Sequence, residues 1–447
     1  MSSDGKAQSI RLADVTSPPM RAFHMAWVAF FVCFFAWFGV APLMGVVRDE
    51  LQLTKDQVGW CLIGSVGATI LARLAAGWLC DRIGPRLTFS GLLVLGALPV
   101  MGIGLARDFP AFLTFRVLIG AIGASFVVTQ YHTSRMFAAN CVGTANAMAA
   151  GWGNLGGGVA QLAMPLLFGA MVGLAGLSES ASWRCSMALV GAVCALTGVA
   201  YYFLTQDTPH GNYRELRAAG RLPQAAAGGF AEAIRDRRVW ALFLIYGASF
   251  GMELTIDNIA VLYFLDYFDY FRQLAPEAAL RRAGLIAAAF GGMNLFARAA
   301  GGWVADRCGN RWGLSGRVHW LFVALFGEGV GLMMFSQATT LAVAIPLMVV
   351  FAMFVKMCNG ATYAVVPFIN PCALGAVSAI VGAGGNVGAV ALGFLFASDS
   401  WDWRAALFIA GAAVTCISFA SFAVIARREP ATAPSPVGAP HELAGAV

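Results

Sequence analysis

Two arginines occupy equivalent positions in a repeated, otherwise apolar pattern. Arg73 begins R-L-A-A-G-W-L-C-D-R-I-G-P-R, and Arg298 begins R-A-A-G-G-W-V-A-D-R-C-G-N-R. Each arginine precedes the aspartate of its copy by eight residues, which corresponds to about 12 Å along a helix. Because half of a bilayer's hydrocarbon core measures about 15 Å, both guanidinium groups are predicted to lie near the membrane midplane.

An arginine at that depth needs a compensating interaction. Its insertion costs on the order of 3 kcal/mol, and its guanidinium stays charged at physiological pH while presenting a planar fork of donors. Two such groups, one in each copy of the repeat, predict a site for a small anion between the copies. The alternative is that each arginine pairs with a carboxylate inside the membrane, for example Glu253, and only holds helices together.

The composition is that of a membrane protein. Of the 447 residues, 59% are apolar and 12% are charged, whereas soluble domains have about 25% charged residues. Apolar stretches long enough to cross a bilayer recur along the chain, so we predict an all-α membrane protein with twelve transmembrane helices. The expected spans are 23–47, 58–79, 88–106, 111–135, 144–173, 184–204, 239–264, 283–305, 317–336, 340–362, 373–396 and 404–426.

The basic residues orient this topology and exclude other classes of protein. Most of the 29 Lys and Arg fall on the side that carries both termini, which the positive-inside rule assigns to the cytoplasm. We therefore expect a multi-pass, monomeric protein of the cytoplasmic (inner) membrane without a nucleic-acid partner. The ten Cys stand singly, without metal-ligand spacing, so we expect no metal and no cofactor. No nucleophile–base pair or nucleotide motif indicates an enzyme.

Two self-matches divide the chain into halves. Besides the arginine repeat, the run G-T-A-N-A-M-A-A-G-W-G-N-L-G around Asn154 matches G-A-V-S-A-I-V-G-A-G-G-N-V-G around Asn386. Repeats in the same order favour two pseudo-symmetric six-helix bundles around a central cavity, with the substrate at their interface. The expected divisions are an N-terminal tail 1–20, a bundle 21–204, a cytoplasmic linker 205–238, a bundle 239–428 and a C-terminal tail 429–447.

These motifs resemble those of a known family. The G-x-x-x-D-R-x-G-x-R loops after spans two and eight resemble the signature of the major facilitator superfamily. Within it, the glycine-rich runs 149–158 and 382–388 resemble the paired signatures of the nitrate/nitrite porters. The phrases G-M-E-L-T-I-D-N at 251–258 and V-V-P-F at 365–368 resemble the nitrate-transporter branch. The resemblance covers all twelve spans and excludes the tails.

The resemblance implies secondary active transport of nitrate, nitrite or both, by alternating access around Arg73 and Arg298. Nitrate is small and planar, with three equivalent acceptor oxygens, which suits the guanidinium fork. A carrier of another small anion would share the arginines but has less reason to carry both glycine-rich signatures. A sensor that binds nitrate without transporting it usually has a large soluble appendage, for which neither the tails nor the linker is long enough.

Span seven carries a stripe of site candidates. Tyr246, Phe250, Glu253 and Asp257 are spaced by four, three and four residues, so they share one face of a helix. The resemblance implies that Tyr246 contacts the substrate, since its hydroxyl can donate to an anion oxygen. Phe250 is expected either to form a wall against the flat anion or to pack in the core, and Phe126 in span four is a similar candidate.

The carboxylates of this stripe suggest proton coupling. A carboxylate beside an anion site repels the substrate unless it is protonated, and burial favours the protonated form. We therefore expect Glu253 or Asp257 to couple nitrate to protons, so that both are carried inward together. The alternatives are that Glu253 permanently neutralises Arg73, Arg298 or Lys356, or that Asp257 caps an external helix end. Nitrate/nitrite exchange would need no protonatable group.

Other charged and amide side chains fit supporting roles. Lys356 in span ten departs from the family pattern: it either enlarges the positive field or pairs with Glu253, and it joins Glu253 and Asp257 as a candidate for proton coupling. Asn154 and Asn386 lie in stripes of small residues that let helices approach closely, so packing is favoured over contact with substrate. The charged residues at the ends of spans two and eight are expected to form gating latches on helix N-termini. These residues are Asp81, Arg82, Arg86, Asp306, Arg307 and Arg311.

Overall fold

The computed structural model describes residues 5–221, 229–274, 276–397 and 400–425. These residues are almost entirely helical, and within those ranges they form no strand. Two isolated β-bridges occur, Ala7 with Phe137 and Thr208 with Gly211. The prediction of an all-α fold is therefore confirmed.

Eighteen α-helices follow one another along the described chain. Their bounds are α1 Pro18–Phe38, α2 Met44–Leu51, α3 Lys55–Ile83, α4 Pro85–Gly102, α5 Phe109–Gly120, α6 Ser125–Met136, α7 Val142–Gly173, α8 Glu179–Leu204, α9 Tyr213–Ala218, α10 Gly229–Arg235, α11 Arg237–Tyr267, α12 Asp269–Arg272, α13 Pro276–Gly292, α14 Ala297–Ser336, α15 Leu341–Val365, α16 Leu374–Ala397, α17 Trp403–Ser418 and α18 Phe422–Ile425.

Among the described residues, eleven continuous helical stretches are long and apolar enough to cross a membrane. The longest of them, Arg282–Ser336, contains two residues with non-helical backbone angles, Trp312 and Gly313. The chain turns back at this break, so the eleven stretches make the twelve crossings predicted from the sequence. Several helices extend beyond the predicted bounds, since polar residues at their ends still complete helical turns.

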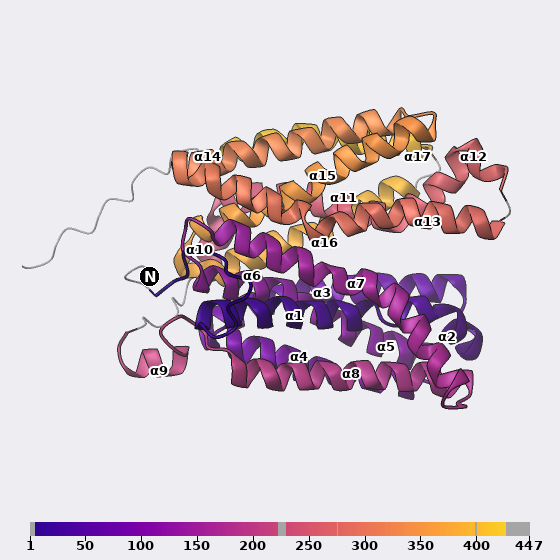
Figure 1. The fold of residues 1–447 in the computed structure, drawn as a ribbon, viewed down its shortest axis with the longest axis horizontal. Coiled ribbons are helices and arrows are strands. Elements are labelled where there is room, and N and C mark those ends of the chain that lie inside the picture. Colours follow the sequence, from indigo (N-terminus) through magenta and orange to yellow (C-terminus); the bar gives the residue numbers. More distant parts are fainter. Residues whose placement is uncertain (1–4, 222–228, 275, 398–399, 426–447) are drawn as a thin grey trace, which may run out of the picture.

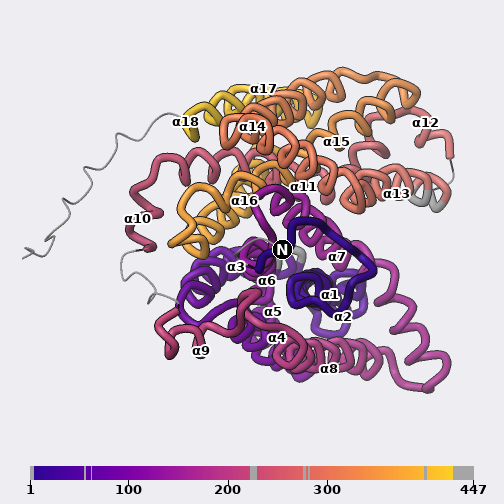
Figure 2. Tube along the Cα trace, turned by 60° about the vertical axis from the view of Figure 1, so that its left-hand side comes forward, coloured from indigo at the N-terminus to yellow at the C-terminus, as the bar shows by residue number. Residues whose placement is uncertain are grey.

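The helices lie in two groups that face each other. In Figure 1, α1–α8 form the lower group and α11–α18 the upper one, and Figure 2 shows the same division from a second direction. The groups meet where α3 packs against α16 and where α7 packs against α14 and α15. The N-terminal segment, α9 and α10 all lie at one end of the bundle (Figure 1). We call this end the terminal side and the opposite end the far side.

Local sequence signals fix the helices that carry the repeated motif. Thr54 and Gln57 form a capping box that starts α3. Gly84 has a φ of +89°, a conformation that favours glycine, and it ends α3 just before Pro85 starts α4. In the second copy, Gly313 has a φ of +60° and allows the break in α14. Each aspartate of the motif is therefore held near the terminal-side end of a crossing.

Candidate anion-binding site

The two repeated arginines converge on one point between the helix groups. Arg73 on α3 and Arg298 on α14 are each only 1% exposed. The Arg73 Cζ atom lies 5.4 Å from the centre of the Phe126 ring and 6.0 Å from that of Phe250. The Arg298 Cζ atom lies 6.0 Å and 5.7 Å from the same two centres. Two residues far apart in the sequence therefore meet at one pair of aromatic rings.

Four aromatic side chains surround these guanidinium groups. The rings of Tyr246 and Phe250 are parallel within 4°, with centres 5.1 Å apart, as expected for neighbouring turns of α11. The ring of Phe126 on α6 stacks on Tyr246 at 5.8 Å and 12°. Tyr363 on α15 meets Phe126 and Tyr246 edge-on, at 4.8 and 5.1 Å. The site is thus a charged point between flat apolar surfaces.

The arginines keep donors that no protein group accepts. Arg73 donates to the Gly382 carbonyl, and Arg298 Nη2 donates to the Tyr246 hydroxyl at 3.3 Å. Arg73 Nε and Arg298 Nη1 are buried without a hydrogen-bond partner, and none of the ion pairs among the described residues includes either arginine. Buried donors without partners are rare in folded proteins. Two buried guanidinium groups with free donors and no ion pair among the described residues have the chemistry to bind an anion.

In the glycine-rich motif of α16, the backbone lies against the rings of Tyr246 and Phe250. A Cβ atom built at Gly385 would lie 2.6 Å from Phe250 Cδ1 and 2.9 Å from Tyr246 Cε1, so a larger residue would displace both rings. Asn386, directly after it, is buried and its Nδ2 has no hydrogen-bond partner. Asn154 on α7 is half-buried, and neither of its amide atoms is bonded. Packing therefore accounts for the glycines, whereas the amides keep unused hydrogen-bonding capacity.

Glu253 on α11 is engaged by three side chains. Its Oε1 lies 2.9 Å from Lys356 Nζ, in an ion pair that lacks the alignment of a hydrogen bond. It also accepts from Asn294 Nδ2 at 2.8 Å, while its Oε2 accepts from Asn359 Nδ2 at 2.6 Å. Glu253 and Lys356 are at most 3% exposed. The pairing with Lys356 is one of the alternatives left open by the sequence.

Asp257 lies one turn of α11 closer to the far side, and its environment differs. Its side chain is exposed, and a Cβ atom built at Gly291 of α13 would lie 3.8 Å from Asp257 Oδ1. Within residues 5–221, 229–274, 276–397 and 400–425, no hydrogen bond or ion pair involves this carboxylate. Of the two carboxylates among the coupling candidates, Asp257 is thus the one without an ion pair in the described part of the chain.

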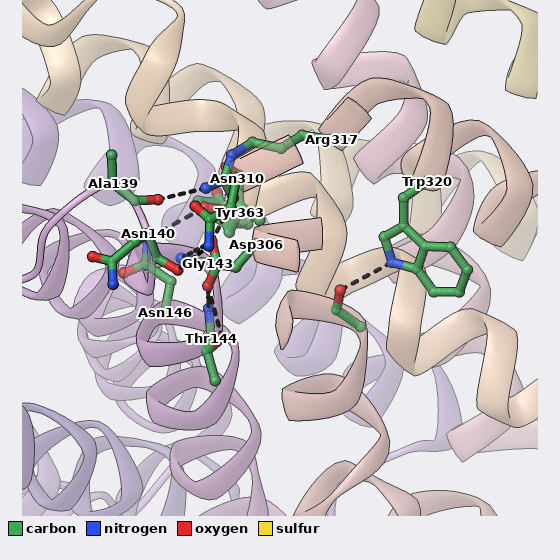
Figure 3. A network of polar contacts seen from close by, with 12 residues as sticks. Ala139, Asn140, Gly143, Thr144, Asn146, Asp306, Asn310, Arg317, Trp320 and Tyr363 are labelled. Atoms are coloured by element: carbon green, nitrogen blue, oxygen red, sulfur yellow. Dashed lines mark hydrogen bonds and ion pairs between the residues drawn. The ribbon is translucent and has the colours of Figure 1, made fainter. Parts of the chain in front are cut away.

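Asp306 joins the two helix groups on the terminal side. Its Oδ1 accepts from the Gly143 amide at 3.0 Å, and its Oδ2 accepts from the Thr144 amide at 2.6 Å and the Thr144 hydroxyl at 2.7 Å. These amides belong to the first turn of α7, where backbone donors are free and the helix dipole favours an anion. Arg317 pairs with the same carboxylate at 2.5 Å (Figure 3). We call this group the Asp306 latch.

Asp81 makes the equivalent connection in the opposite direction. It extends from α3 to the first turn of α16, accepting from the Gly375 amide at 3.1 Å and the Ala376 amide at 3.2 Å. The backbones touch here, because a Cβ atom at Gly77 would lie 2.3 Å from the Gly375 oxygen. We call this group the Asp81 latch. Each latch places a carboxylate of one helix group on a helix N-terminus of the other.

The arginines flanking the two aspartates lie elsewhere. Arg82 and Arg307 stack on the tryptophan four residues earlier in their own helices, with Cζ atoms 4.4 and 4.5 Å from the ring centres. Arg86 stacks on Tyr202 at 4.5 Å, and Arg311 on Trp312 at 5.2 Å. None of the hydrogen bonds or ion pairs in the described residues joins these four arginines to either latch carboxylate. Arg317, which was not among the predicted residues, forms the ion pair with the carboxylate of the Asp306 latch.

Several contributors to the site were missed from the sequence. Tyr363 and Asn359 are four residues apart on α15, and Asn359 follows by three residues Lys356, which the sequence did single out, so helical periodicity in an apolar span could have revealed a polar face. Asn294 precedes Arg298 by one turn, which is a similar signal. The Gly382 carbonyl gives no such signal, since any residue has one.

The two pseudo-equivalent helix groups are shared with known proteins. The family model of the Major Facilitator Superfamily matches residues 26–371. The chain belongs to this superfamily. It is 39% identical to the high affinity nitrate transporter 2.5 of Arabidopsis thaliana, over 89% of this chain and 78% of that one. It is 30% identical to the nitrate/nitrite transporter NrtP of Nostoc punctiforme, over 83% of this chain and 85% of that one.

These similarities confirm the two predictions made from the motifs, namely the major facilitator superfamily and, within it, a resemblance to the nitrate/nitrite porters. The relatives are named as transporters, so the chain is a multi-pass membrane transporter and not an enzyme. Solved structures support the fold: the human organic anion transporter MFSD10 superposes with a TM-score of 0.64 at 14% identity, covering 91% of this chain and all of that one. The proton:xylose symporter XylE gives 0.62 at 14% identity, covering 91% and 94%.

Proposed function

We propose that this protein carries nitrate, nitrite or both across the cytoplasmic membrane by alternating access. One observation supports this above all: Arg73 and Arg298, from opposite helix groups, meet at the same two rings with free donors and no ionic partner among the described residues. The names of the similar nitrate and nitrate/nitrite transporters point to the same substrate.

The chemistry of the site suits a small planar anion. Two guanidinium groups around an empty site repel each other, and a bound anion replaces this repulsion with attraction. The parallel rings of Tyr246 and Phe250 offer flat faces, against which a planar oxyanion fits better than a tetrahedral one. The Tyr246 hydroxyl accepts a bond from Arg298, so its own proton remains available for an anion oxygen.

The two latches supply the element that changes during transport. We assign the terminal side to the cytoplasm, following the distribution of Lys and Arg. In that assignment the structure represents a state closed towards the cytoplasm, because Asp81 and Asp306 both bridge the helix groups there. Opening requires each carboxylate to leave its helix N-terminus for water. Nitrate would therefore enter from the far side and leave after both latches separate.

The charge balance of the site supports proton symport. An anion bound between the arginines makes protonation of a neighbouring carboxylate more favourable, and by linkage the proton favours the anion equally. Glu253 is occupied by Lys356 and two amides, which supports its role as permanent neutraliser. We therefore place the coupling function on Asp257, which is exposed on the same face of α11.

Transport assays in liposomes test the proposal as a whole. We expect the purified protein to drive nitrate counterflow at a fixed membrane potential, and an inward proton gradient to accelerate nitrate uptake. Nitrite should compete strongly with nitrate uptake. Lactate should compete weakly because it is bulkier than nitrate, and phosphate should compete weakly because it is tetrahedral. Uptake that depends on internal nitrite and ignores the proton gradient would favour nitrate/nitrite exchange. Preference for lactate or phosphate would show that the carrier serves another anion.

Substitution Asp257→Asn tests the coupling. It should abolish acceleration of nitrate uptake by a proton gradient while nitrate counterflow stays within about threefold of wild type, because the arginines are untouched. The measurement is nitrate-dependent proton flux with a pH-sensitive dye inside liposomes. Asn258→Ala on the neighbouring exposed position serves as matched control. Unchanged proton flux in Asp257→Asn would refute the assignment and leave Glu328, which is buried without a hydrogen-bond partner, as the next carboxylate to test.

A further inference from the structure

The N-terminal segment before α1 runs along the loop between α6 and α7. The Ala7 amide donates to the Met136 carbonyl at 3.0 Å, and the Ala7 carbonyl accepts from the Ala138 amide at 2.9 Å. Asn140 Nδ2 donates to the Gln8 carbonyl at 2.8 Å. Apolar side chains of the segment, Ala7 and Ile10, pack against the cluster that contains Phe137. The segment is thus hydrogen-bonded both to the last residue of α6 and to the loop that follows it.

The opposite side of the same loop faces the second helix group. The Ala139 carbonyl accepts from Arg317 Nη2 at 2.5 Å, and the Asn140 carbonyl accepts from Asn310 Nδ2 at 3.2 Å (Figure 3). The loop then leads into Gly143, the first amide held by the Asp306 latch. The loop 137–141 therefore lies between the N-terminal segment and the residues that close the terminal side.

The second half of the chain repeats this arrangement with the linker. Helix α10 precedes α11 as the N-terminal segment precedes α1, and it lies against the loop before α16. Asn370 Nδ2 donates to Glu232 Oε2 of α10 at 3.3 Å, and Arg238 Nη2, in the first turn of α11, donates to the Ile369 carbonyl at 3.0 Å. From the first helix group, Arg135 Nη2 donates to the Pro371 carbonyl at 3.4 Å. In both halves the segment before the first crossing supports the loop that feeds a latch.

We propose that residues 5–13 act as a strap that stabilises the state closed on the terminal side by holding loop 137–141 in its latching conformation. This inference rests on the proposed alternating access. Ordering the backbone of a free loop costs conformational entropy, and a loop already held in place does not have to meet that cost when the latch forms. A freed loop would present the Ala139 and Asn140 carbonyls to Arg317 and Asn310 less often. Loss of the strap shifts the population towards the open state.

The chain contains a native reporter for this contact. Cys141 ends the loop, is 9% exposed, and its Sγ donates to the Ala7 carbonyl at 3.4 Å. Burial, together with the nearby Asp306 carboxylate, raises the pKa of the Cys141 thiol to about 11. Alkylation needs the thiolate, so below pH 11 its rate rises about tenfold per pH unit and is slow at neutral pH.

Deletion of residues 2–13 is the test, because it removes the strap but keeps Asp14, which bonds the Ser17 amide and hydroxyl just before α1. Labelling by a membrane-permeant maleimide is followed at each cysteine by peptide mass spectrometry in the intact membrane protein. We expect Cys141 to react at least tenfold faster after the deletion, with its pH profile shifted towards lower pH. The substitution Ala7→Pro, which removes the amide donor to Met136, should act in the same direction, whereas Ala7→Ser should not.

A second reporter separates gate opening from simple uncovering of Cys141. Ala147 on α7 is 1% exposed and packs at the seam between the helix groups, where a Cβ atom at Gly302 would lie 2.6 Å from it. In an Ala147→Cys background, the deletion should accelerate labelling at position 147 several-fold. Faster labelling of Cys141 alone would overturn the proposal and show that the segment is only a cover. Neither readout needs nitrate. Failure of nitrate transport would therefore reject the proposed substrate but would not contradict the role of residues 5–13 in stabilising the closed state.

Discussion

Replacing Arg298 by Lys is expected to lower nitrate uptake at least about 100-fold while the protein still inserts and folds. Lysine keeps the charge but is a point donor, whereas the arginine fork binds an oxyanion through two parallel hydrogen bonds. Each hydrogen bond to a charged group contributes about 1.5–3 kcal/mol, and about 1.4 kcal/mol corresponds to a factor of ten. Arg73→Lys should have an effect of the same order, since Arg73 lies at similar distances from the same rings.

The measurement is initial nitrate uptake into liposomes, with nitrate-dependent thermal stabilisation in detergent as a direct readout of binding. Tyr246→Phe is the graded comparison, because it removes one hydroxyl and keeps the stacked ring; we expect a loss of about tenfold, at the lower end of the range for one hydrogen bond to a charged group. Arg116→Lys serves as a control for a buried arginine outside the site, whose guanidinium donates to the Trp37 carbonyl. Full uptake in both Arg73→Lys and Arg298→Lys would contradict the site.

The sequence contains enough information to predict the fold and the centre of the site. Span length and low charge predict the helices, because a bilayer leaves few alternatives. The depth of Arg73 and Arg298 follows from counting residues along a helix. Their convergence follows from the repeat, because duplicated halves place equivalent positions around one axis. The stripe of Tyr246 and Phe250 follows from helical periodicity.

Contacts between different helices were harder to predict, because they depend on how each helix is rotated about its axis. Glu253 had several possible basic partners in the sequence, and only the packing of α11 against α15 selects Lys356. The same holds for Arg317, which reaches Asp306 because α14 folds back after its break. Backbone carbonyls such as that of Gly382 carry no signal in the sequence at all. The strap was likewise invisible, since its bonds to the loop are mostly main-chain bonds.

The pseudo-symmetry of the chain extends beyond the motifs from which it was inferred. Both latches join a carboxylate at the end of one helix to the start of another helix in the opposite group. Because the two contacts are reciprocal, separating the groups breaks both at once. We therefore expect the two latches to open together, whereas the two arginines lie nearer the middle of the same helices. This arrangement allows binding at the centre to be coupled to closure at one end.

Replacing only one member of the ion pair between Glu253 and Lys356 should strongly destabilise the protein. Glu253→Gln leaves a buried ammonium without its partner, and Lys356→Met leaves a buried carboxylate held only by two amides. Removing one member of a buried pair typically costs about 3–5 kcal/mol. We therefore expect each single variant to unfold at a clearly lower temperature in detergent and to accumulate poorly in membranes.

The double variant Glu253→Gln/Lys356→Met should regain most of that stability, because it leaves no buried charge unpaired. The amide oxygen of the introduced glutamine can accept from one of Asn294 and Asn359, and its NH2 group can donate to the free Oδ1 of the other once that amide flips. The measurements are thermal unfolding and nitrate-driven proton flux on the same preparations. If the pair is a permanent neutraliser, the double variant transports nitrate with coupled protons. If stability returns but proton coupling is lost, Glu253 carries the proton and the assignment to Asp257 is wrong. The double variant thus separates the two roles that the sequence left open for Glu253.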